Sequence, residues 1–217
     1  MRILFVGNSH TYMNGLPYQV CELINAAAGR RECEVSMVTA GGQSLAWHAG
    51  EPGTQMSIAC SRWDFVVLQQ QTHPFAGYAQ LAADYEGLRP HLEKSGAKVL
   101  LYVTWKRRDV PESDQETLDA AFARLARERA LRLVPVGAAW RRARERFPEI
   151  ELYAADGAHA SPAGTYLAAC VFFGVLTGKP PRGLPARLAA NGTVLAELPL
   201  ERAQALQGIA AEIRQGQ

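Results

Sequence analysis

The sequence predicts an α/β protein in which a parallel sheet is covered by helices on both faces. Short runs rich in aliphatic and β-branched residues alternate with longer stretches of helical period, which is the order that βαβ units require. The runs at 2–7, 64–70 and 97–104 are apolar over most of their length, as strands buried on both faces must be. We expect these three strands at the centre of the sheet. Five strands are predicted in all, at 2–7, 33–38, 64–70, 97–104 and 132–137.

Apolar stripes and end signals predict the helices. Two stripes at helical spacing indicate helices that pack on the sheet: Val20, Leu23, Ile24 and Ala27 in the first, and Leu118, Phe122 and Leu125 in the second. A further helix is predicted after Ser161, a suitable N-cap that is followed by Pro162 at the first helical position. This helix is apolar on almost every side and ends at Gly178, so we expect it to be buried. Segment 200–215 has the pattern of a final amphipathic helix.

Length and composition favour a single globular domain. A chain of 217 residues can bury one sizeable core, and 48% hydrophobic with 20% charged residues is ordinary for a folded protein. We place the core in residues 1–178 and treat 179–217 as a C-terminal extension. The net charge of +2 does not favour a nucleic-acid partner. The locally basic run at 140–147 is expected to be a solvated helix face.

The sequence carries no signal for secretion or membrane insertion. Its opening run MRILFVG is strand-like and too short for a signal-peptide core, and no apolar stretch reaches about 18 residues. The four cysteines lack the C-x-x-C spacing of a zinc site or the pattern of a disulfide framework. We therefore expect a cytoplasmic protein with reduced thiols, no membrane partner and no metal.

Ligands of open parallel sheets bind at the carboxyl ends of the strands, so the segments that follow strands are the functional candidates. These segments are GNSHT after the first strand, TAGGQS after the second, QQQTHPF after the third and TWKRR after the fourth. The stretch DGAHASP, just before the apolar helix, joins them.

Ser9 is either a turn residue or a nucleophile. Taken alone, a small polar residue at a strand end is common in turns. A serine hydroxyl becomes a nucleophile when a histidine accepts its proton and a third group orients that histidine. Asp156 and His159 lie three residues apart in a glycine-containing loop and can supply the orienting acid and the base. Their presence favours the nucleophile.

The other histidines are weaker candidates for the base. His10 adjoins Ser9 and is expected to point away from it if the chain stays extended. His48 and His91 are expected on helix surfaces. His73 lies in a loop and remains an alternative.

Ester cleavage also needs hydrogen-bond donors for the developing oxyanion. Gly41 and Gly42 can present backbone N–H groups at close range, and they can equally form a tight turn. Three consecutive glutamines end the third strand. The alternation of a strand places Gln69 and Gln71 on one side and Gln70 on the other.

These segments together resemble the sequence blocks of the SGNH hydrolases, the GDSL-type superfamily of lipases and esterases. FVGNSHT resembles the first block, AGGQS the glycine block, and DGAHASPAGTYLAA the last block, where an aspartate and a histidine complete the triad. Their order and spacing make the resemblance specific. The third block departs from the pattern, because QQQTH lacks the G-x-N-D sequence whose asparagine donates to the oxyanion.

The resemblance implies a three-layer α/β/α sandwich, flavodoxin-like in organisation, that hydrolyses esters without a cofactor. It implies Ser9 as the nucleophile, Asp156 as the orienting acid and His159 as the base. The backbone N–H groups of Ser9 and Gly42 would bind the oxyanion. A glutamine amide would add a third donor, since it can replace the asparagine from a longer side chain.

Two sets of residues stay open at this stage. For the third oxyanion donor, Gln71 is preferred over Gln69 or His73. For substrate binding, the candidates are Asn8, His10, His73 and Trp105, with Trp47, Phe75 and the basic run 106–108 as further pocket residues. The expected substrate is a small-molecule ester, such as a small acyl group on a carbohydrate or another polar alcohol.

Two other functions compete with the esterase. The first is a phosphate- or nucleotide-binding module in which GNSHTYMNG wraps an anion, but the chain lacks G-x-G-x-x-G and G-K-[ST]. The second is a non-catalytic carbohydrate-binding protein that retains the scaffold without turnover.

Overall fold

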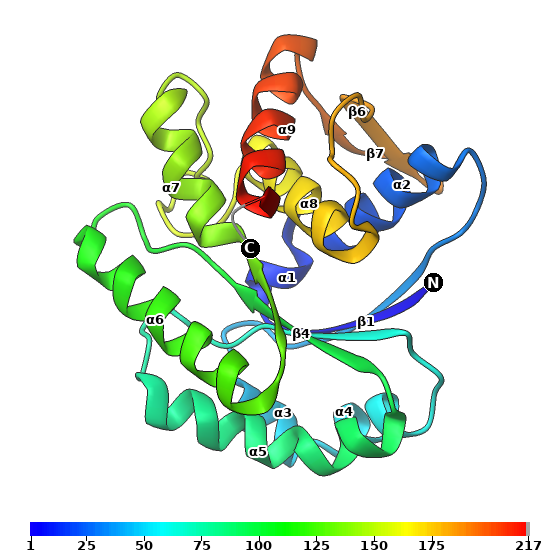
Figure 1. Ribbon diagram of the computed structural model, residues 1–217, viewed down its shortest axis with the longest axis vertical. Coiled ribbons are helices and arrows are strands. Elements are labelled where there is room, and N and C mark those ends of the chain that lie inside the picture. The colour runs from blue at the N-terminus through cyan, green and yellow to red at the C-terminus, as the bar shows by residue number, and fades with distance from the viewer. Residues whose placement is uncertain (216–217) are drawn as a thin grey trace.

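The computed structural model describes residues 1–215 and contains a five-stranded parallel sheet in the order β2-β1-β3-β4-β5 (Figure 1). Its strands are β1 (Arg2–Gly7), β2 (Glu34–Thr39), β3 (Phe65–Leu68), β4 (Lys98–Val103) and β5 (Arg132–Pro135). The three strands predicted to be central are central. This order is the flavodoxin-like one, with its switch point between β1 and β3.

Helices cover both faces of the sheet and complete three layers (Figure 1). One face packs against α2 (Leu16–Ala28), α7 (Val136–Arg146), α8 (Pro162–Thr177) and α9 (Leu200–Gln215). The other face packs against α3 (Leu45–Gly50), α4 (Pro52–Ala59), α5 (Tyr78–Ser95) and α6 (Glu112–Arg129). Successive side chains of β1 enter the two cores alternately, with Phe5 in the first and Val6 in the second. The predicted α/β/α fold class is confirmed.

The apolar helix predicted after Ser161 is α8. The Ser161 side chain accepts a hydrogen bond from the Gly164 N–H at 3.1 Å, and Gly178 ends the helix with φ 70°. Gly164 is required by close packing, because a Cβ there would lie 2.3 Å from the Leu152 carbonyl oxygen. The helix is buried over nearly its whole length, as predicted.

The first predicted apolar stripe is only partly buried. Val20, Leu23 and Ile24 of α2 lie in the core, whereas Ala27 is exposed near the end of the helix. The second stripe, on α6, is buried as expected.

The C-terminal segment contains a hairpin that the sequence analysis missed. Strands β6 (Arg187–Ala190) and β7 (Thr193–Glu197) pair antiparallel across Asn191 and Gly192, both at positive φ. An Asn-Gly pair is a strong hairpin signal that was available in the sequence. Helix α9, predicted at its observed bounds, follows and lies beside α8 (Figure 1). Its Leu206 and Ile209 side chains belong to the core.

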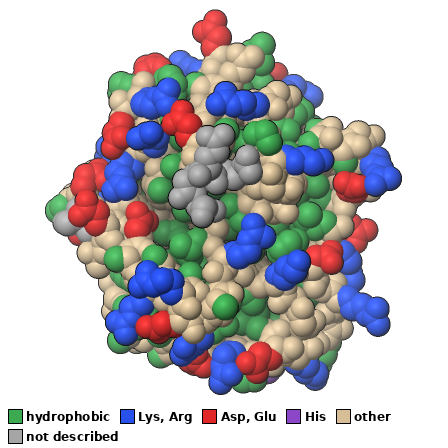
Figure 2. Space-filling view, in the orientation of Figure 1, with side chains coloured by type: hydrophobic (Ala, Val, Ile, Leu, Met, Phe, Trp, Pro, Cys, Tyr) green, Lys and Arg blue, Asp and Glu red, His purple; other side chains and the backbone are tan. Residues whose placement is uncertain are grey.

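The basic run at 140–147 belongs to α7 and pairs with α9. Arg142 and Arg146 lie 3.5 Å and 2.5 Å from the carboxylate of Glu212. On the face shown in Figure 2, Lys and Arg side chains are interspersed with Asp and Glu. Within residues 1–215, no helix has both the length and the hydropathy of a bilayer span.

Candidate active site

Ser9 stands directly after β1, at the carboxyl edge of the sheet. Asn8 is extended and caps the short helix α1 (Ser9–Tyr12), with its side-chain oxygen accepting from the His10 N–H at 3.1 Å. The chain therefore turns into a helix at Ser9 and does not stay extended. For this reason His10 does not leave the site, and its ring centroid lies 5.0 Å from that of His159.

The structure brings Ser9, His159 and Asp156 together across about 150 residues of chain. The Ser9 Oγ lies 2.8 Å from His159 Nε2, and His159 Nδ1 donates to Asp156 Oδ2 at 2.5 Å. Asp156 Oδ1 also accepts from the backbone N–H groups of Ala158 and His159 at 2.9 Å. The loop thus curls around the carboxylate, which brings Asp156 and His159 into contact.

The Asp156 carboxylate is held in its ionised form. Its hydrogen bond with the His159 ring and that from the Ala158 N–H keep its pKa well below the usual range, although half of its side chain is exposed. An ionised carboxylate accepts the Nδ1 proton, so the lone pair of His159 Nε2 faces the serine hydroxyl. This tautomer is the one that a general base requires.

Asn14, which the sequence analysis did not single out, and the backbone of Arg108 hold the His159 loop in place. Asn14, at φ 52°, donates from Nδ2 to the Ala160 carbonyl and to Thr165 Oγ1, each at 2.9 Å. The Arg108 N–H donates to the Gly157 carbonyl at 2.8 Å. No sequence pattern announces these bonds, since each joins segments far apart in the chain.

Two of the predicted substrate-binding residues are buried and hydrogen-bond to the loops around the site. Trp105 is only 1% exposed, donates from its indole to the Ala158 carbonyl at 2.8 Å, and stacks on Trp140. Asn8 is buried and donates from Nδ2 to the Gln43 carbonyl at 3.0 Å. That bond ties Ser9 to the turn that contains Gly42, which is exposed at φ 71°.

Gln69 and Gln70 point to opposite sides, as the alternation predicts, and both are committed to the scaffold. Gln69 is buried and accepts from the Asn8 N–H at 2.7 Å and from the Thr11 hydroxyl at 3.0 Å. A Cβ on Gly7 would lie 2.5 Å from this glutamine oxygen, so a glycine is needed there. Gln69 Nε2 in turn donates to the Gln70 carbonyl at 2.5 Å.

Gln70 points to the opposite side of the strand and is buried as well. Its oxygen accepts from the backbone N–H groups of Leu45 and Gln71, and its Nε2 donates to Asp84 on α5 at 2.5 Å. Gln71 is half-buried, and within residues 1–215 its side-chain amide has no protein partner. Of the three amides, that of Gln71 is free to contact a substrate.

Three histidine rings form a stack that leads away from Ser9. The ring of His10 lies between the rings of His159 and His73, and its centroid is 4.9 Å from that of His73. Burial lowers the pKa of His10 to about 3, and burial together with Arg107 lowers that of His73 to about 4. Both rings are therefore neutral at physiological pH. His73 is further bonded to the Trp105 carbonyl at 2.9 Å.

The expectation that His48 lies on a helix surface is wrong. His48 is buried beneath the sheet edge, where Nε2 donates to the Gly7 carbonyl at 2.9 Å and Nδ1 accepts from Thr54 at 3.0 Å. A histidine can be buried there because both ring nitrogens are satisfied.

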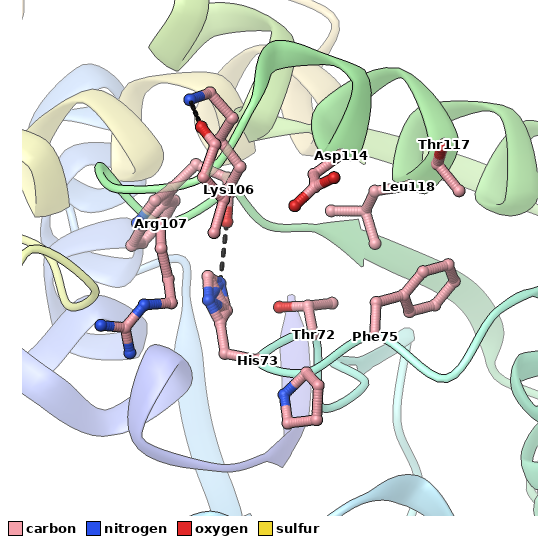
Figure 3. Close-up of a pocket in the computed structure, with 11 residues that line it drawn as sticks. Thr72, His73, Phe75, Lys106, Arg107, Asp114, Thr117 and Leu118 are labelled. Carbon is pink, nitrogen blue, oxygen red and sulfur yellow. Dashed lines mark hydrogen bonds between the residues drawn. The ribbon is translucent and has the colours of Figure 1, made fainter.

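A cavity of about 480 Å³ opens beside this stack (Figure 3). Its walls are formed by the segments after β3 and β4 and by α6: Thr72, His73, Pro74, Phe75, Trp105, Lys106, Arg107, Val110, Asp114, Thr117 and Leu118. Phe75, Trp105 and Lys106 lie where the sequence analysis expected pocket residues. Trp47 is 39% exposed and is not part of this wall, and neither is Arg108.

No family model matches the sequence, and no curated protein matches it. Solved structures match over most of the chain. A DUF4886 family protein from Bacteroides uniformis is 19% identical, with a TM-score of 0.75 over 98% of this chain and 93% of the other. The acetyl xylan esterase AlAXEase is 16% identical, with a TM-score of 0.64 over 81% of this chain and 100% of the other.

A member of the lipolytic G-D-S-L family from Veillonella parvula is 14% identical, with a TM-score of 0.61 over 82% of this chain and 98% of the other. At sequence identities this low, the matches show a similarity of backbone fold only. The sheet order and the covering helices agree with that arrangement. The chain has the fold of the SGNH hydrolase superfamily.

Proposed function

We propose that this protein is a serine esterase in which Ser9 is the nucleophile, His159 the general base and Asp156 the orienting acid. The observation that carries the proposal is the continuous hydrogen-bonded line from Ser9 Oγ through the His159 ring to the Asp156 carboxylate. A buried turn or an exposed loop has no need of such a line. The structural likeness to esterases and lipases supports the same reaction class.

In the first half-reaction, the Ser9 oxygen attacks the ester carbonyl carbon while its proton moves to His159 Nε2. The tetrahedral intermediate collapses when the resulting imidazolium gives this proton to the departing alcohol oxygen, leaving an acyl group on Ser9. Water then repeats the sequence, with His159 taking a proton from water, and the carboxylic acid is released. Asp156 stays ionised throughout and stabilises the imidazolium.

The oxyanion is bound by the backbone N–H groups of Ser9 and Gly42 and by the side-chain amide of Gln71. Within residues 1–215, neither of these two N–H groups donates to another protein group. Gln71 completes the set because Gln69 and Gln70 are already bonded to other protein groups. This arrangement replaces the asparagine of the usual third block with a glutamine.

The substrate is a small acyl ester of a carbohydrate or of another polar alcohol. The acetyl xylan esterase among the structural neighbours supports a short acyl group. The cavity beside His73 offers both apolar and polar walls to the rest of the molecule.

A serine-directed fluorophosphonate probe tests the proposal. We expect a covalent adduct on Ser9, located by peptide mass spectrometry, and hydrolysis of 4-nitrophenyl acetate that the probe abolishes. Ser9→Ala should lose both, whereas Ser36→Ala, which changes an exposed serine of β2, should keep both. A folded protein that gives no adduct would point to a non-catalytic binding protein on the same scaffold.

A further inference from the structure

The cavity lies on the side of Ser9 from which the proposed alcohol product departs. His73 belongs to its wall, and the ring stack His73–His10–His159 connects it to the base. The 157–159 loop is bonded to the segment after β4, which forms another wall. Gly42 follows β2, and β2 lies beyond β1 from β3 and β4. The cavity and the Gly42 turn thus lie on opposite sides of Ser9.

The positions of the cavity and of Gly42 indicate where the acyl half and the alcohol half of a bound ester lie. The departing oxygen must come within hydrogen-bond reach of His159 Nε2, because it receives its proton there. The carbonyl oxygen points toward the Gly42 N–H. The alcohol half therefore lies on the His159 side, next to the cavity.

Each basic residue of the cavity wall already has an acidic partner. The Lys106 ammonium donates to the Val110 carbonyl at 2.5 Å (Figure 3). It also lies 3.3 Å from the Glu112 carboxylate. The Arg107 guanidinium pairs with Asp109 at 3.0 Å. The sequence alone indicated cationic donors at these positions, and the folded chain pairs each of them with a carboxylate.

Asp114, in contrast to these paired cations, carries an unpaired charge within the described part of the chain. It lies in the first turn of α6, and its carboxylate points into the cavity between Lys106 and Leu118 (Figure 3). Within the described part of the chain, this carboxylate has neither an ion pair nor a hydrogen bond. Phe75 and Leu118 supply apolar surface close to it, and the neutral His73 ring adds no opposing charge.

We propose that this cavity receives the alcohol half of the ester and that Asp114 selects alcohols that carry an ammonium group. The inference rests on the proposed esterase function. An unpaired carboxylate at an apolar and aromatic wall attracts a cation, and a cation on an aromatic face gains further. The same carboxylate repels phosphorylated or carboxylated alcohols. An ammonium-bearing polar alcohol is thus the substrate class that this cavity fits.

A pair of isosteric esters provides the test. Acetylcholine carries a quaternary ammonium group, and 3,3-dimethylbutyl acetate has a carbon in place of the nitrogen. We expect kcat/KM to be about fivefold higher for acetylcholine, in line with a single charge contact at the exposed Asp114 carboxylate. Asp114→Asn should bring this ratio close to one. Glu116→Gln, which changes an exposed carboxylate of α6 outside the cavity wall, should preserve it.

Equal rates for the two esters, or a ratio that survives Asp114→Asn, would overturn the assignment of Asp114 while leaving the esterase intact. A binding measurement separates the two proposals further. Adding choline to the Ser9→Ala protein should shift the backbone amide resonances of residues 72–75 and 114–118 in its NMR spectrum. Adding 3,3-dimethylbutanol should shift them less at the same concentration. Choline binding that depends on Asp114 supports the cavity even if no ester is hydrolysed. Absent or Asp114-independent binding contradicts it.

Discussion

Two polar clusters meet at the same edge of the sheet and differ in what their hydrogen bonds do. The first consists of Ser9, His159 and Asp156, and it is partly exposed. The second surrounds Gln69 and Gln70, and it is fully buried. In the first cluster, the serine hydroxyl remains available to an incoming molecule. In the second, the oxygen and amide of each glutamine are bonded to protein groups.

The difference shows that a polar residue at a strand end can serve the scaffold as readily as the reaction. Gln69 and Gln70 satisfy backbone N–H groups where β3 ends and the loops of its neighbours begin, groups that would otherwise be buried without partners. These hydrogen bonds hold the backbone at the sheet edge where Ser9 of the candidate triad lies. Variants in the first cluster should therefore affect turnover, and variants in the second should affect stability.

The largest effect is expected for the candidate triad. Ser9→Ala and His159→Ala should each lower kcat for ester hydrolysis by about 10³- to 10⁶-fold, because the residues act as a unit. Steady-state kinetics on 4-nitrophenyl acetate measures this loss, and circular dichroism checks the fold. The double variant should be no slower than either single one. A clear further loss in the double variant would contradict the assignment.

Gln71 lies between the two clusters and sharpens the comparison. If its free amide binds the oxyanion, Gln71→Ala should lower kcat by about 10²- to 10³-fold with little change in KM, since the bond strengthens in the transition state. The free energy of unfolding should hardly change. A loss of stability with normal turnover would place Gln71 in the scaffold with its neighbours.

Gln70 provides the converse variant. Gln70→Ala should lower the free energy of unfolding by about 2–3 kcal/mol, because it removes one of the two amide partners of the buried Asp84 carboxylate and leaves two backbone N–H groups without a partner. Urea titration followed by fluorescence measures the change. Gln80→Ala is the matched control, since Gln80 contacts the same carboxylate at 2.5 Å from an exposed position. Equal stability of the two variants would contradict a structural role for Gln70.

The smallest effect concerns the histidine stack. A histidine of the unfolded chain has a pKa of about 6.5, whereas the folded values are about 3 for His10 and about 4 for His73. Between these values the unfolded chain binds more protons, so stability falls as the pH falls. We expect each of the two histidines to contribute on the order of 1–2 kcal/mol to the loss from pH 6.5 to 5, measured by urea titration at each pH. His10→Phe should reduce this loss, and an equal loss in that variant would assign it to other groups.

The sequence was sufficient for the architecture and for the identity of the triad candidates. Alternating apolar runs and helical stripes specify which segments form strands and helices, and burial on both faces marks the central strands. These signals are local, so they need no knowledge of distant contacts. The Asn191–Gly192 hairpin was equally readable, because its turn depends on two adjacent residues at positive φ.

Only the tertiary structure decided which polar residues are free and which are bonded. Nothing in the sequence around His48, Gln70 or Asp114 distinguishes a buried, satisfied group from one that faces a cavity. His48 is satisfied by Gly7 and Thr54, the Gln70 amide by Asp84 on another element, and the cations next to Asp114 by Asp109 and Glu112. Such partners are set by the packing of β-strands and helices against one another, and a hydrogen bond depends on distances of a few tenths of an ångström. Composition and spacing determine which groups the chain carries to the sheet edge, and packing determines which of them remain available for chemistry.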